Sequence, residues 1–396
     1  MTRDAEVREA SSGDAGLPVI GVISTWNSQC GIAAYTRSLM SGIAPKRLRV
    51  FASKVAAVLD ADESFVSRCW IEGWDDPLDE LFQAVQAAHV DAVVIQFNFG
   101  LFRPAALKQL LDRLHAAGIP VFMTLHATMD VNHPGMTASL RDIRTALAKV
   151  RRLLVHSVHD LNRLKDIGLL ENVTLFPMGV PSPFQVDRVE MRRSLGLDDK
   201  TVVASFGYLL PNKGLPELIH AFALLRGKCP DAHLLMLNAL YPMAPSIHER
   251  DKCLNEIHRL DLTRCVTLVT DFLDEASALA CLAAADIVVC PYQHTQESAS
   301  AAVKMGLGSG TPVAVTPLPI FADVAEVSHV LPGTAPAEIA AGLASLLSNP
   351  SRLAAHAERQ RDWAAAHDWA ILSRRLDGLI SGCVGASKVR GGHCAS

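Results

Sequence analysis

Short apolar runs alternate with helix-like segments along most of this chain, and this alternation constrains the fold more than any other feature. The runs occupy residues 19–24, 91–97, 121–125 and 153–156, and then 201–206, 232–237, 266–270, 287–290 and 313–315. They are apolar on both faces, which is typical of strands buried in a parallel sheet between helical crossovers. The pattern predicts an α/β protein with doubly wound parallel sheets and ligand sites at the carboxyl ends of its strands.

The alternation is interrupted once, and this divides the chain into two predicted domains. The chain has 396 residues, 49% of them apolar, which is too much for one ordinary core. A charged, proline-containing stretch over 181–200 separates the two series of strands, so we place the connection there. The predicted parts are a disordered start over 1–16, domains over 17–185 and 186–366, a terminal helix over 367–382 and a disordered tail over 383–396.

Composition and charge exclude several classes of function. The formal net charge of −4 gives no reason to expect a nucleic-acid partner. No apolar run approaches the roughly 18 residues of a membrane span, and the first residues lack a hydrophobic signal core. The 9 cysteines are scattered without a CxxC pair, which favours reduced thiols over disulfides or zinc. We therefore expect a cytoplasmic protein.

The segment over 286–324 carries most of the functional information. Its pattern predicts strand, polar loop, helix and strand, and the loop contains Glu297 followed by Ser298, Ala299 and Ser300. The N–H groups in the first turn of a helix have no partner within the helix, and the helix dipole is positive there. The loop therefore suits a phosphate. Taken alone, Glu297 is as well explained as a favourable partner of the helix dipole.

A second polar loop follows the apolar run over 201–206. Gly207 ends this run, and Lys213 with Gly214 precedes a predicted helix over 215–225. A lysine at a helix start opposes the helix dipole, and a bound anion would explain its presence. A surface lysine is the alternative interpretation.

Two further residues follow strands of the first predicted domain. Gly31 begins a helix after the run over 19–24, and a glycine permits close approach of another group to its backbone. His126 comes directly after the run over 121–125, where catalytic side chains of α/β proteins are usually found. A simple turn and a structural histidine are the alternatives.

Ser157 and Asp160 form a local motif of a different kind. The spacing S-x-x-D after the run over 153–156 is typical of a helix N-cap, with Ser157 as the capping residue. The neighbouring pair His156 and His159 has a spacing seen in metal sites, but no third ligand accompanies it. The pattern therefore favours a helix start over a metal site.

In order and spacing, these motifs resemble the signature regions of the large retaining family of GT-B glycosyltransferases, family 4, which includes many bacterial polysaccharide enzymes. The resemblance extends over about residues 19–380. In that family a Glu begins the helix, here Glu297, and a G-T-P-V turn follows, here residues 310–313. The resemblance implies two Rossmann-like domains facing a cleft, with a terminal helix that crosses back to the first domain.

The resemblance also implies roles for individual residues. Glu297 and His126 would be the catalytic residues that hold the transferred sugar. The donor-binding residues lie in loops at strand ends and helix starts: Gly31, Gly207, Lys213, Ser298, Ala299 and Ser300. Asn98 and Phe99 follow the run over 91–97 and would line the acceptor side, where the aromatic rings either stack on the acceptor or pack in the core.

Three positions depart from the family pattern. Tyr208 stands where the family has an Arg, and Met178 stands where it has a His. Met305 replaces the second Glu, which usually accepts hydrogen bonds from the ribose of the donor. A methionine cannot accept these bonds in the same way, so ribose recognition must differ.

The predicted function is retaining transfer of a hexosyl group from GDP-mannose or a UDP-hexose to a glycan or lipid-linked acceptor in surface polysaccharide synthesis. Contact with the inner membrane face is compatible with this setting. No metal or other cofactor is expected, because no Asp-x-Asp lies in a suitable loop. A catalytically impaired sugar-nucleotide-binding partner of the same fold is one alternative, and a GT-B epimerase is another.

Overall fold

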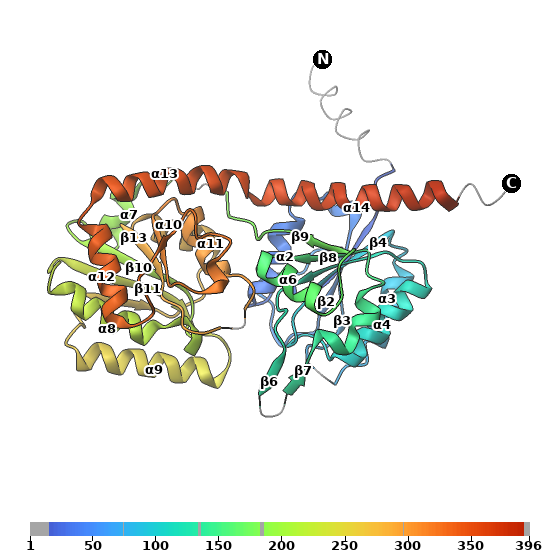
Figure 1. Cartoon of the computed structure of the whole chain (residues 1–396), viewed down its shortest axis with the longest axis horizontal. Helices are drawn as coiled ribbons and strands as arrows, with labels where there is room; N and C mark the ends of the chain where they lie inside the picture. The colour runs from blue at the N-terminus through green and yellow to red at the C-terminus, as the bar shows by residue number, and fades with distance from the viewer. Residues whose placement is uncertain (1–15, 74, 134–135, 183–185, 296, 392–396) are drawn as a thin grey trace, which may run out of the picture. The chain divides into compact units, whose positions relative to one another are not determined.

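The computed structural model describes residues 16–73, 75–133, 136–182, 186–295 and 297–391, which form two compact units (Figure 1). One unit comprises the chain up to Val155, Leu161–Leu175 and the chain from Leu372 onward. The other unit comprises His156–Asp160 and Phe176–Ile371. The predicted α/β class with two parallel sheets is confirmed, and the predicted disordered start lies outside the described residues except for Gly16.

The first unit is built on a 7-stranded sheet in the order β3-β2-β1-β4-β5-β8-β9, in which all neighbouring strands are parallel. The strands are β1 (Ile20–Ser24), β2 (Leu48–Ser53), β3 (Val66–Trp70), β4 (Ala92–Phe97), β5 (Val121–Leu125), β8 (Arg152–Val155) and β9 (Val173–Leu175). The helices and turns are α2 (Gly31–Met40), η1 (Pro45–Arg47), α3 (Asp79–Ala87), α4 (Pro104–Ala116), η2 (Leu140–Ile143) and α5 (Arg144–Leu147). A hairpin of β6 (Val131–His133) and β7 (Met136–Ala138) follows β5.

The second unit contains a 6-stranded parallel sheet in the order β12-β11-β10-β13-β14-β15. Its strands are β10 (Thr201–Tyr208), β11 (Ala232–Ala239), β12 (Val266–Val269), β13 (Ile287–Cys290), β14 (Val313–Val315) and β15 (His329–Val330). Its helices and turns are α7 (Arg188–Ser194), η3 (Pro211–Lys213), α8 (Leu215–Arg226), α9 (Ala244–Arg259), α10 (Glu275–Ala283), α11 (Ala301–Gly308), η4 (Pro319–Phe321), α12 (Pro336–Leu347) and α13 (Pro350–Ala366). α6 (Val158–Asp166) begins in this unit and continues in the first, and α14 (Trp369–Gly391) likewise spans the division.

Apolar side chains fill both faces of each sheet, as the unbroken apolar runs predict. Every residue of β1, β4 and β5 is buried. In β10, Val203 joins the core on one face of the sheet, whereas Val202 and Ala204 join the core on the other. This alternation follows from the two-residue period of a strand.

Several strands at the sheet edges are not evident from apolar runs. β2, β3, β9 and β15 were not predicted from the sequence. Of these, β3, β9 and β15 are edge strands, and β3 and β9 are only partly buried, whereas β2 lies between β3 and β1. An edge strand has a neighbour on one side only, so it needs no continuous apolar run. The sequence signal is correspondingly weaker there.

The end of the chain differs from its prediction. The sequence suggests a disordered tail from residue 383, but α14 continues as a helix to Gly391. Within the first unit, α14 is fixed by Asp377, which accepts two hydrogen bonds from the buried Arg47 guanidinium at 2.6 and 2.9 Å. Ser373 Oγ also accepts a hydrogen bond from the N–H of Gly42. These contacts precede the predicted tail and join residues that are 330 and 331 positions apart, so the local sequence does not reveal them.

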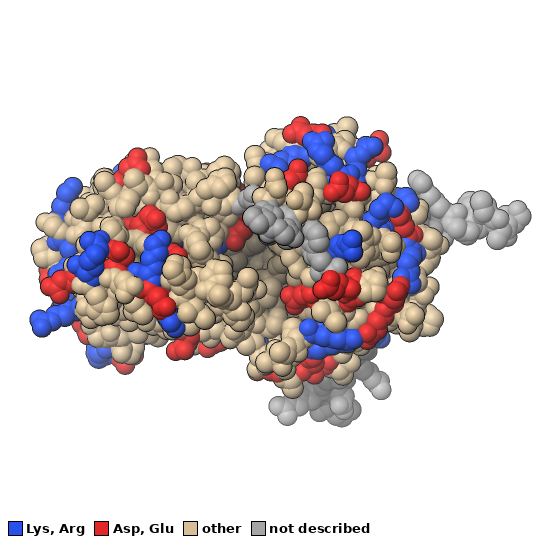
Figure 2. All heavy atoms as spheres, turned by 90° about the horizontal axis from the view of Figure 1, so that it is seen from below, with Lys and Arg blue, Asp and Glu red and all other residues tan. Residues whose placement is uncertain are grey.

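Three bulk properties of the described residues bear on function. No helix among them combines the length and the apolar character needed to cross a bilayer. The described cysteines are free thiols. On the face drawn in Figure 2, acidic and basic side chains are interspersed over each unit.

Two neutral histidines in the second unit make its stability sensitive to acid. Arg352 donates to Nδ1 of His329, and Arg359 donates to Nδ1 of His356. Burial, reinforced by neighbouring positive charge, lowers the pKa of His329 to about 4 and also lowers the pKa of His356. Protonation of either ring would place a cation against an arginine.

We therefore expect the unfolding free energy to fall as the pH drops from about 6.5 toward 4. In this range the unfolded chain binds protons that the folded unit does not, so stability increases with pH. His329→Gln should flatten this dependence, because glutamine can still accept from Arg352 and does not titrate. Urea titrations between pH 4 and 7 measure the unfolding free energy of each variant, and His258→Gln, at an exposed histidine, is the control. Equal pH dependence in the two variants would contradict the assignment.

Candidate active site

The centre of the candidate site is an ion pair between Lys213 and Glu297, which are 84 residues apart in sequence. Lys213 Nζ donates to Glu297 Oε2 at 2.8 Å. Lys213 ends η3, which follows β10, and Glu297 lies in the loop after the neighbouring strand β13. Because parallel neighbours end at the same edge of a sheet, the topology brings the two predicted residues together.

Glycine at position 214 makes this close approach possible. Gly214 has a φ of +66°, and a Cβ built on it would lie 2.0 Å from the carbonyl oxygen of Pro291. The backbone after η3 therefore touches the backbone after β13 directly. Gln293 N–H, two residues further on, donates to the carbonyl of Asn212 at 2.9 Å. The loops that carry Lys213 and Glu297 are thus held together by their main chains.

The ammonium group of Lys213 is buried and stays charged. Its side chain is 11% exposed, and Nζ lies 4.2 Å from the centroid of the Tyr292 ring. Burial alone would lower the pKa of Lys213, but the adjoining Tyr292 and Glu297 groups raise it above the usual lysine value. A buried cation is costly unless it is paired, so Glu297 is the main reason that this one is tolerated. An ammonium has three donors, and Glu297 takes one of them.

The helix after Glu297 begins later than the sequence suggests. α11 starts at Ala301, with Ser300 as its N-cap, so Glu297 lies in the loop before the helix and does not begin it. Ser300 Oγ accepts from the N–H of Val303 at 3.3 Å and lies 3.0 Å from the Tyr292 hydroxyl. The hydroxyls of Ser298 and Ser300 bond groups outside this segment or cap the helix, which favours irregular backbone between Glu297 and α11. The predicted phosphate-binding segment is therefore a loop followed by a capped helix start.

Gly207 lies beside this helix start. It has a φ of +128°, and a Cβ there would lie 3.5 Å from the side chain of Ala302 in the first turn of α11. The end of β10 and the start of α11 are thus adjacent. Gly207, Lys213 and the segment from Glu297 to Ser300 gather at one end of the second sheet.

Tyr208, at the position of the family arginine, packs with other aromatic rings. Its ring centroid is 5.0 Å from that of Tyr241 and 6.1 Å from that of Phe272. Tyr208 is the last residue of β10, and Tyr241 and Phe272 follow the adjacent strands β11 and β12. Tyr208 brings no positive charge, so in this loop Lys213 is the residue placed to meet an anion.

Met305, at the position of the family's second glutamate, has a structural role in the core. Met305 packs against the core on one face of the second sheet. Lys304, next to it, is 2% exposed and donates to Asp323 at 2.5 Å, with Nζ 4.6 Å from the Trp363 ring. Lys304 therefore serves the interior of the unit and does not replace the glutamate. Met178, the third departure, is also buried.

In the first unit, His126 is held by a residue that sequence reasoning missed. His126 Nε2 lies 2.8 Å from Oε1 of Gln96, which is fully buried in β4. The imidazole also packs edge-on against the Tyr35 ring of α2, with centroids 4.7 Å apart. Because an amide oxygen only accepts, Nε2 carries the proton in this arrangement. A glutamine near the end of the strand predicted over 91–97, between Ile95 and Phe97, was the available signal.

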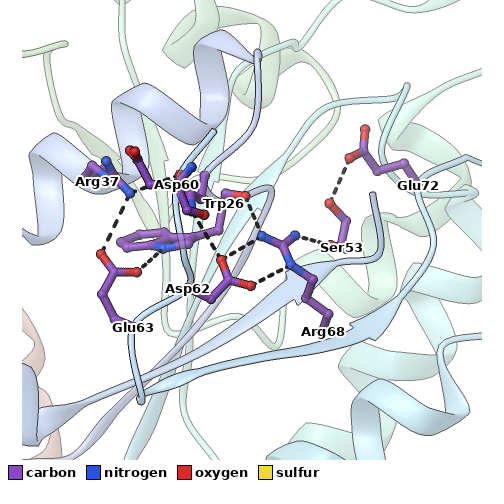
Figure 3. Close-up of polar contacts among 9 residues, drawn as sticks. Trp26, Arg37, Ser53, Asp60, Asp62, Glu63, Arg68 and Glu72 are labelled. Atoms are coloured by element: carbon purple, nitrogen blue, oxygen red, sulfur yellow. Dashed lines mark hydrogen bonds and ion pairs between the residues drawn. The ribbon is translucent and has the colours of Figure 1, made fainter. Parts of the chain in front are cut away.

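The loop that leads to Gly31 is clamped by a polar network, which Figure 3 shows. Arg68 on β3 is its centre and bonds the carboxylate of Asp62 at 2.7 and 2.8 Å and the carbonyls of Trp26 and Ser53. Trp26 Nε1 donates to Glu63 at 3.0 Å. The hydrogen bond to Arg68 is the main cause that lowers the pKa of Asp62. The network fixes the loop before α2.

Gly31 itself is exposed as the first residue of α2. A Cβ built on it meets nothing within 4 Å. Its N-cap residue, Cys30, makes no side-chain capping bond. The structure therefore leaves room for a group at Gly31, but it shows no packing need for glycine there.

Phe99, one of the two residues predicted on the acceptor side, is buried in the core. Phe99 is 2% exposed and packs edge-on against Phe97, with centroids 5.0 Å apart. Its ring offers no face to an acceptor, so the interpretation as a core residue is the correct one. Asn98 is half-buried, and its Oδ1 accepts from the N–H of Gly100 at 2.9 Å, which shapes the loop after β4. Edge-on packing of these two aromatic rings thus closes the core at this strand end.

The structure also identifies partners that were not predicted. Tyr292 contacts Lys213 through its ring and Ser300 through its hydroxyl. Asp160 does cap α6 with Ser157, as the S-x-x-D spacing predicts, but it also binds Ser298. Within the described residues, no group of three or more His, Cys, Asp or Glu side chains is placed to hold a metal ion.

Comparison with known proteins agrees with this arrangement. Residues 187–364 match the family model described as glycosyl transferases group 1. A GDP-mannose-dependent monoacylated alpha-(1-6)-phosphatidylinositol monomannoside mannosyltransferase of Corynebacterium glutamicum is 25% identical over an alignment of 376 positions, which covers 88% of this chain and 94% of that protein. The chain is a GT-B glycosyltransferase.

Solved structures share the fold of this glycosyltransferase at low sequence identity. Sucrose-phosphate synthase from Thermosynechococcus elongatus has a TM-score of 0.74 at 16% identity, and the match covers 93% of this chain and 99% of that one. Anabaena HepE in complex with UDP and glucose has a TM-score of 0.70 at 17% identity, covering 92% and 99%. An alpha,alpha-trehalose-phosphate synthase from Burkholderia xenovorans in complex with glucose-6-phosphate has a TM-score of 0.68 at 12% identity, covering 91% and 99%.

Proposed function

We propose that this glycosyltransferase moves a hexosyl group from a nucleoside-diphosphate sugar to a glycan or lipid-linked acceptor, with retention of the anomeric configuration. The observation that carries the proposal is the contact of the Lys213 ammonium with Glu297 beside the start of α11. This contact places a cation, a carboxylate and the N–H groups of a helix start together at the carboxyl ends of β10 and β13. A cation and the N–H groups of a helix start suit a diphosphate, and a carboxylate can accept hydrogen bonds from sugar hydroxyls.

The chemistry demands stabilisation of the leaving group. As the bond between the sugar and the diphosphate breaks, negative charge grows on the phosphate oxygens and positive charge grows on the sugar ring. The donors of Lys213 not used by Glu297, together with the first-turn N–H groups of α11, would stabilise the departing diphosphate. They are held in place before the reaction, so little reorganisation is needed.

The sugar itself would be held by groups that accept from its hydroxyls. Glu297 is half-exposed, with 43% of its side chain accessible, so its free oxygen can reach a sugar hydroxyl. His126 keeps the sugar-binding role that the family resemblance implies, and Gln96 would fix its tautomer. In this proposal the donor phosphate takes the proton of the acceptor hydroxyl, and neither a metal ion nor another cofactor takes part.

GDP-mannose is the first donor to test, and UDP-hexoses are the second. The Corynebacterium relative is named as GDP-mannose-dependent, whereas HepE is bound to UDP and glucose. The proposed setting is surface polysaccharide synthesis in the cytoplasm, with contact to the inner membrane face through the acceptor. This setting is supported by the family resemblance alone.

A panel of sugar nucleotides tests the proposal. We expect one of GDP-mannose and the UDP-hexoses to raise the melting temperature, because a ligand at 100 times its Kd stabilises the native state by about 2.7 kcal/mol. Sugar transfer should require an added glycan or lipid-linked acceptor and should be lost in Glu297→Ala. The exposed Glu326→Ala in the same unit is the matched control.

Other outcomes would support the alternatives. Donor binding without transfer to any acceptor, at the same affinity in Glu297→Ala, would favour a binding partner protein. Conversion of the sugar nucleotide without an acceptor would indicate an epimerase. Retention is read from the anomeric configuration of the product by NMR, and inversion would contradict that part of the proposal.

A further inference from the structure

Asp160 is a buried carboxylate that links a distant helix start to the predicted diphosphate loop. It is 2% exposed, and Ser298 Oγ donates to its Oδ1 at 2.8 Å across 138 residues of sequence. Its other oxygen, Oδ2, accepts from Ser157 Oγ at 2.6 Å. The carboxylate thus holds two hydroxyl groups, one from its own capping motif and one from the loop that follows Glu297.

The helix cap fixes where this carboxylate sits. The N–H of Asp160 donates to Ser157 Oγ at 3.1 Å, so the backbone and the side chain of Asp160 both bind the same serine. Ser157 is buried as well, which excludes water from the pair. Hydrogen bonds to a charged group are about twice as strong as neutral ones, and burial strengthens them further. Asp160 is therefore a rigid anchor.

Ser298 is the point at which the anchor meets the donor loop. The residue before it is Glu297, which binds Lys213, and two residues after it Ser300 caps α11. Unlike its exposed neighbour Glu297, Ser298 is buried. In the segment that joins Glu297 to Ser300, the Ser298 hydroxyl provides the side-chain bond to a distant part of the chain, Asp160. The direction of the backbone N–H groups in this segment thus depends on Asp160.

We propose that Asp160 is a positioning residue for the donor diphosphate, which it orients through Ser298. The inference rests on the proposed function, because it assigns the loop after Glu297 to the diphosphate. Asp160 does not touch the donor; it holds the loop in the conformation that binds. If the loop loses this conformation, its N–H donors are misplaced. We therefore expect a larger effect on nucleotide affinity than on the stability of the fold.

Binding of free GDP and UDP to the full chain tests this inference. We expect Asp160→Ala to raise the Kd of the nucleoside diphosphate that wild type binds by about tenfold, the effect of a lost charge-assisted hydrogen bond. Ser298→Ala should weaken binding in the same direction. In the double variant the two effects should not add, because both substitutions break one interaction. Isothermal titration calorimetry measures all four Kd values.

Controls separate positioning from general destabilisation. Ser157→Ala removes the other hydroxyl partner of the same carboxylate but leaves its bond to Ser298, so it should lower the melting temperature and raise the Kd by less than Asp160→Ala does. Hydrogen exchange of the peptide over 293–303 should become faster in Asp160→Ala, while exchange in β10 and β11 stays as in wild type. If the alanine variant folds poorly, Asp160→Asn takes its place in the test. Asparagine has the same shape and keeps one oxygen acceptor, so this variant should retain most of the wild-type affinity.

The outcomes distinguish this inference from the proposed function. If wild type binds neither GDP nor UDP, the proposed function fails. If wild type binds one of them and folded Asp160→Ala binds it equally well, Asp160 has no positioning role. Additive effects in the double variant, or an equal loss of affinity in Ser157→Ala, would also overturn the inference.

Discussion

Replacing Lys213 with alanine is expected to lower kcat/KM for sugar transfer by about 10²- to 10³-fold. This is the usual cost of removing one preorganised donor that stabilises developing negative charge. Lys213 is the cation that the structure places against Glu297, and Tyr208 supplies no charge at the position of the family arginine. Steady-state kinetics with the donor identified by the panel measures the effect.

The folded state should survive this substitution. Glu297 loses its partner, but its side chain is 43% exposed and can be solvated by water. The Lys213 methylenes leave a small space beside Tyr292, which costs some stability without unfolding the unit. The loss should therefore appear in turnover much more than in the melting temperature.

The exposed Lys228→Ala, just after the other end of α8, is the matched control and should keep wild-type kinetics. Lys213→Arg tests geometry, because a guanidinium keeps the charge but is larger and planar, and it should recover activity only in part. If Lys213→Ala keeps kcat/KM within about threefold of wild type, the leaving group is stabilised elsewhere and the electrostatic proposal is wrong.

Gly214→Ala is expected to destabilise the second unit by about 2–5 kcal/mol. Part of this cost comes from the φ of +66°, which is unfavourable by about 1–2 kcal/mol for a residue with a Cβ. The rest comes from the Pro291 carbonyl oxygen, which would lie 2.0 Å from the new methyl group. A backbone oxygen at the end of a buried strand cannot turn away as a flexible side chain can.

Activity should fall with stability in this variant, because relief of the clash moves Lys213 away from Glu297. Urea denaturation and kinetics of the same preparation measure both effects. Gly310→Ala is the control: its φ is +74°, but a Cβ there meets nothing within 4 Å, so it bears the conformational cost alone. Equal loss of stability in the two variants would show that the contact with Pro291 does not matter.

Much of the fold is readable from the sequence because buried parallel strands leave a local signal. The bounds predicted for β5, β13 and β14 are those of the structure, and other predicted strands differ by a few residues at their ends. The S-x-x-D cap at Ser157 is predictable for the same reason, because its partners are three residues apart. The start of α11 was placed too early, because the side-chain bonds of Ser298 and Ser300 hold the preceding backbone outside the helix.

By itself, the sequence determined the class of fold, the division into two series of strands and the loops in which Lys213, Glu297 and His126 lie. Only the tertiary structure decided which residues meet: Lys213 with Glu297, Ser298 with Asp160, and His126 with Gln96. It also decided that Phe99 is buried. Apolar periodicity is a property of neighbouring residues, whereas these contacts depend on the order of strands in each sheet, which local pattern does not encode.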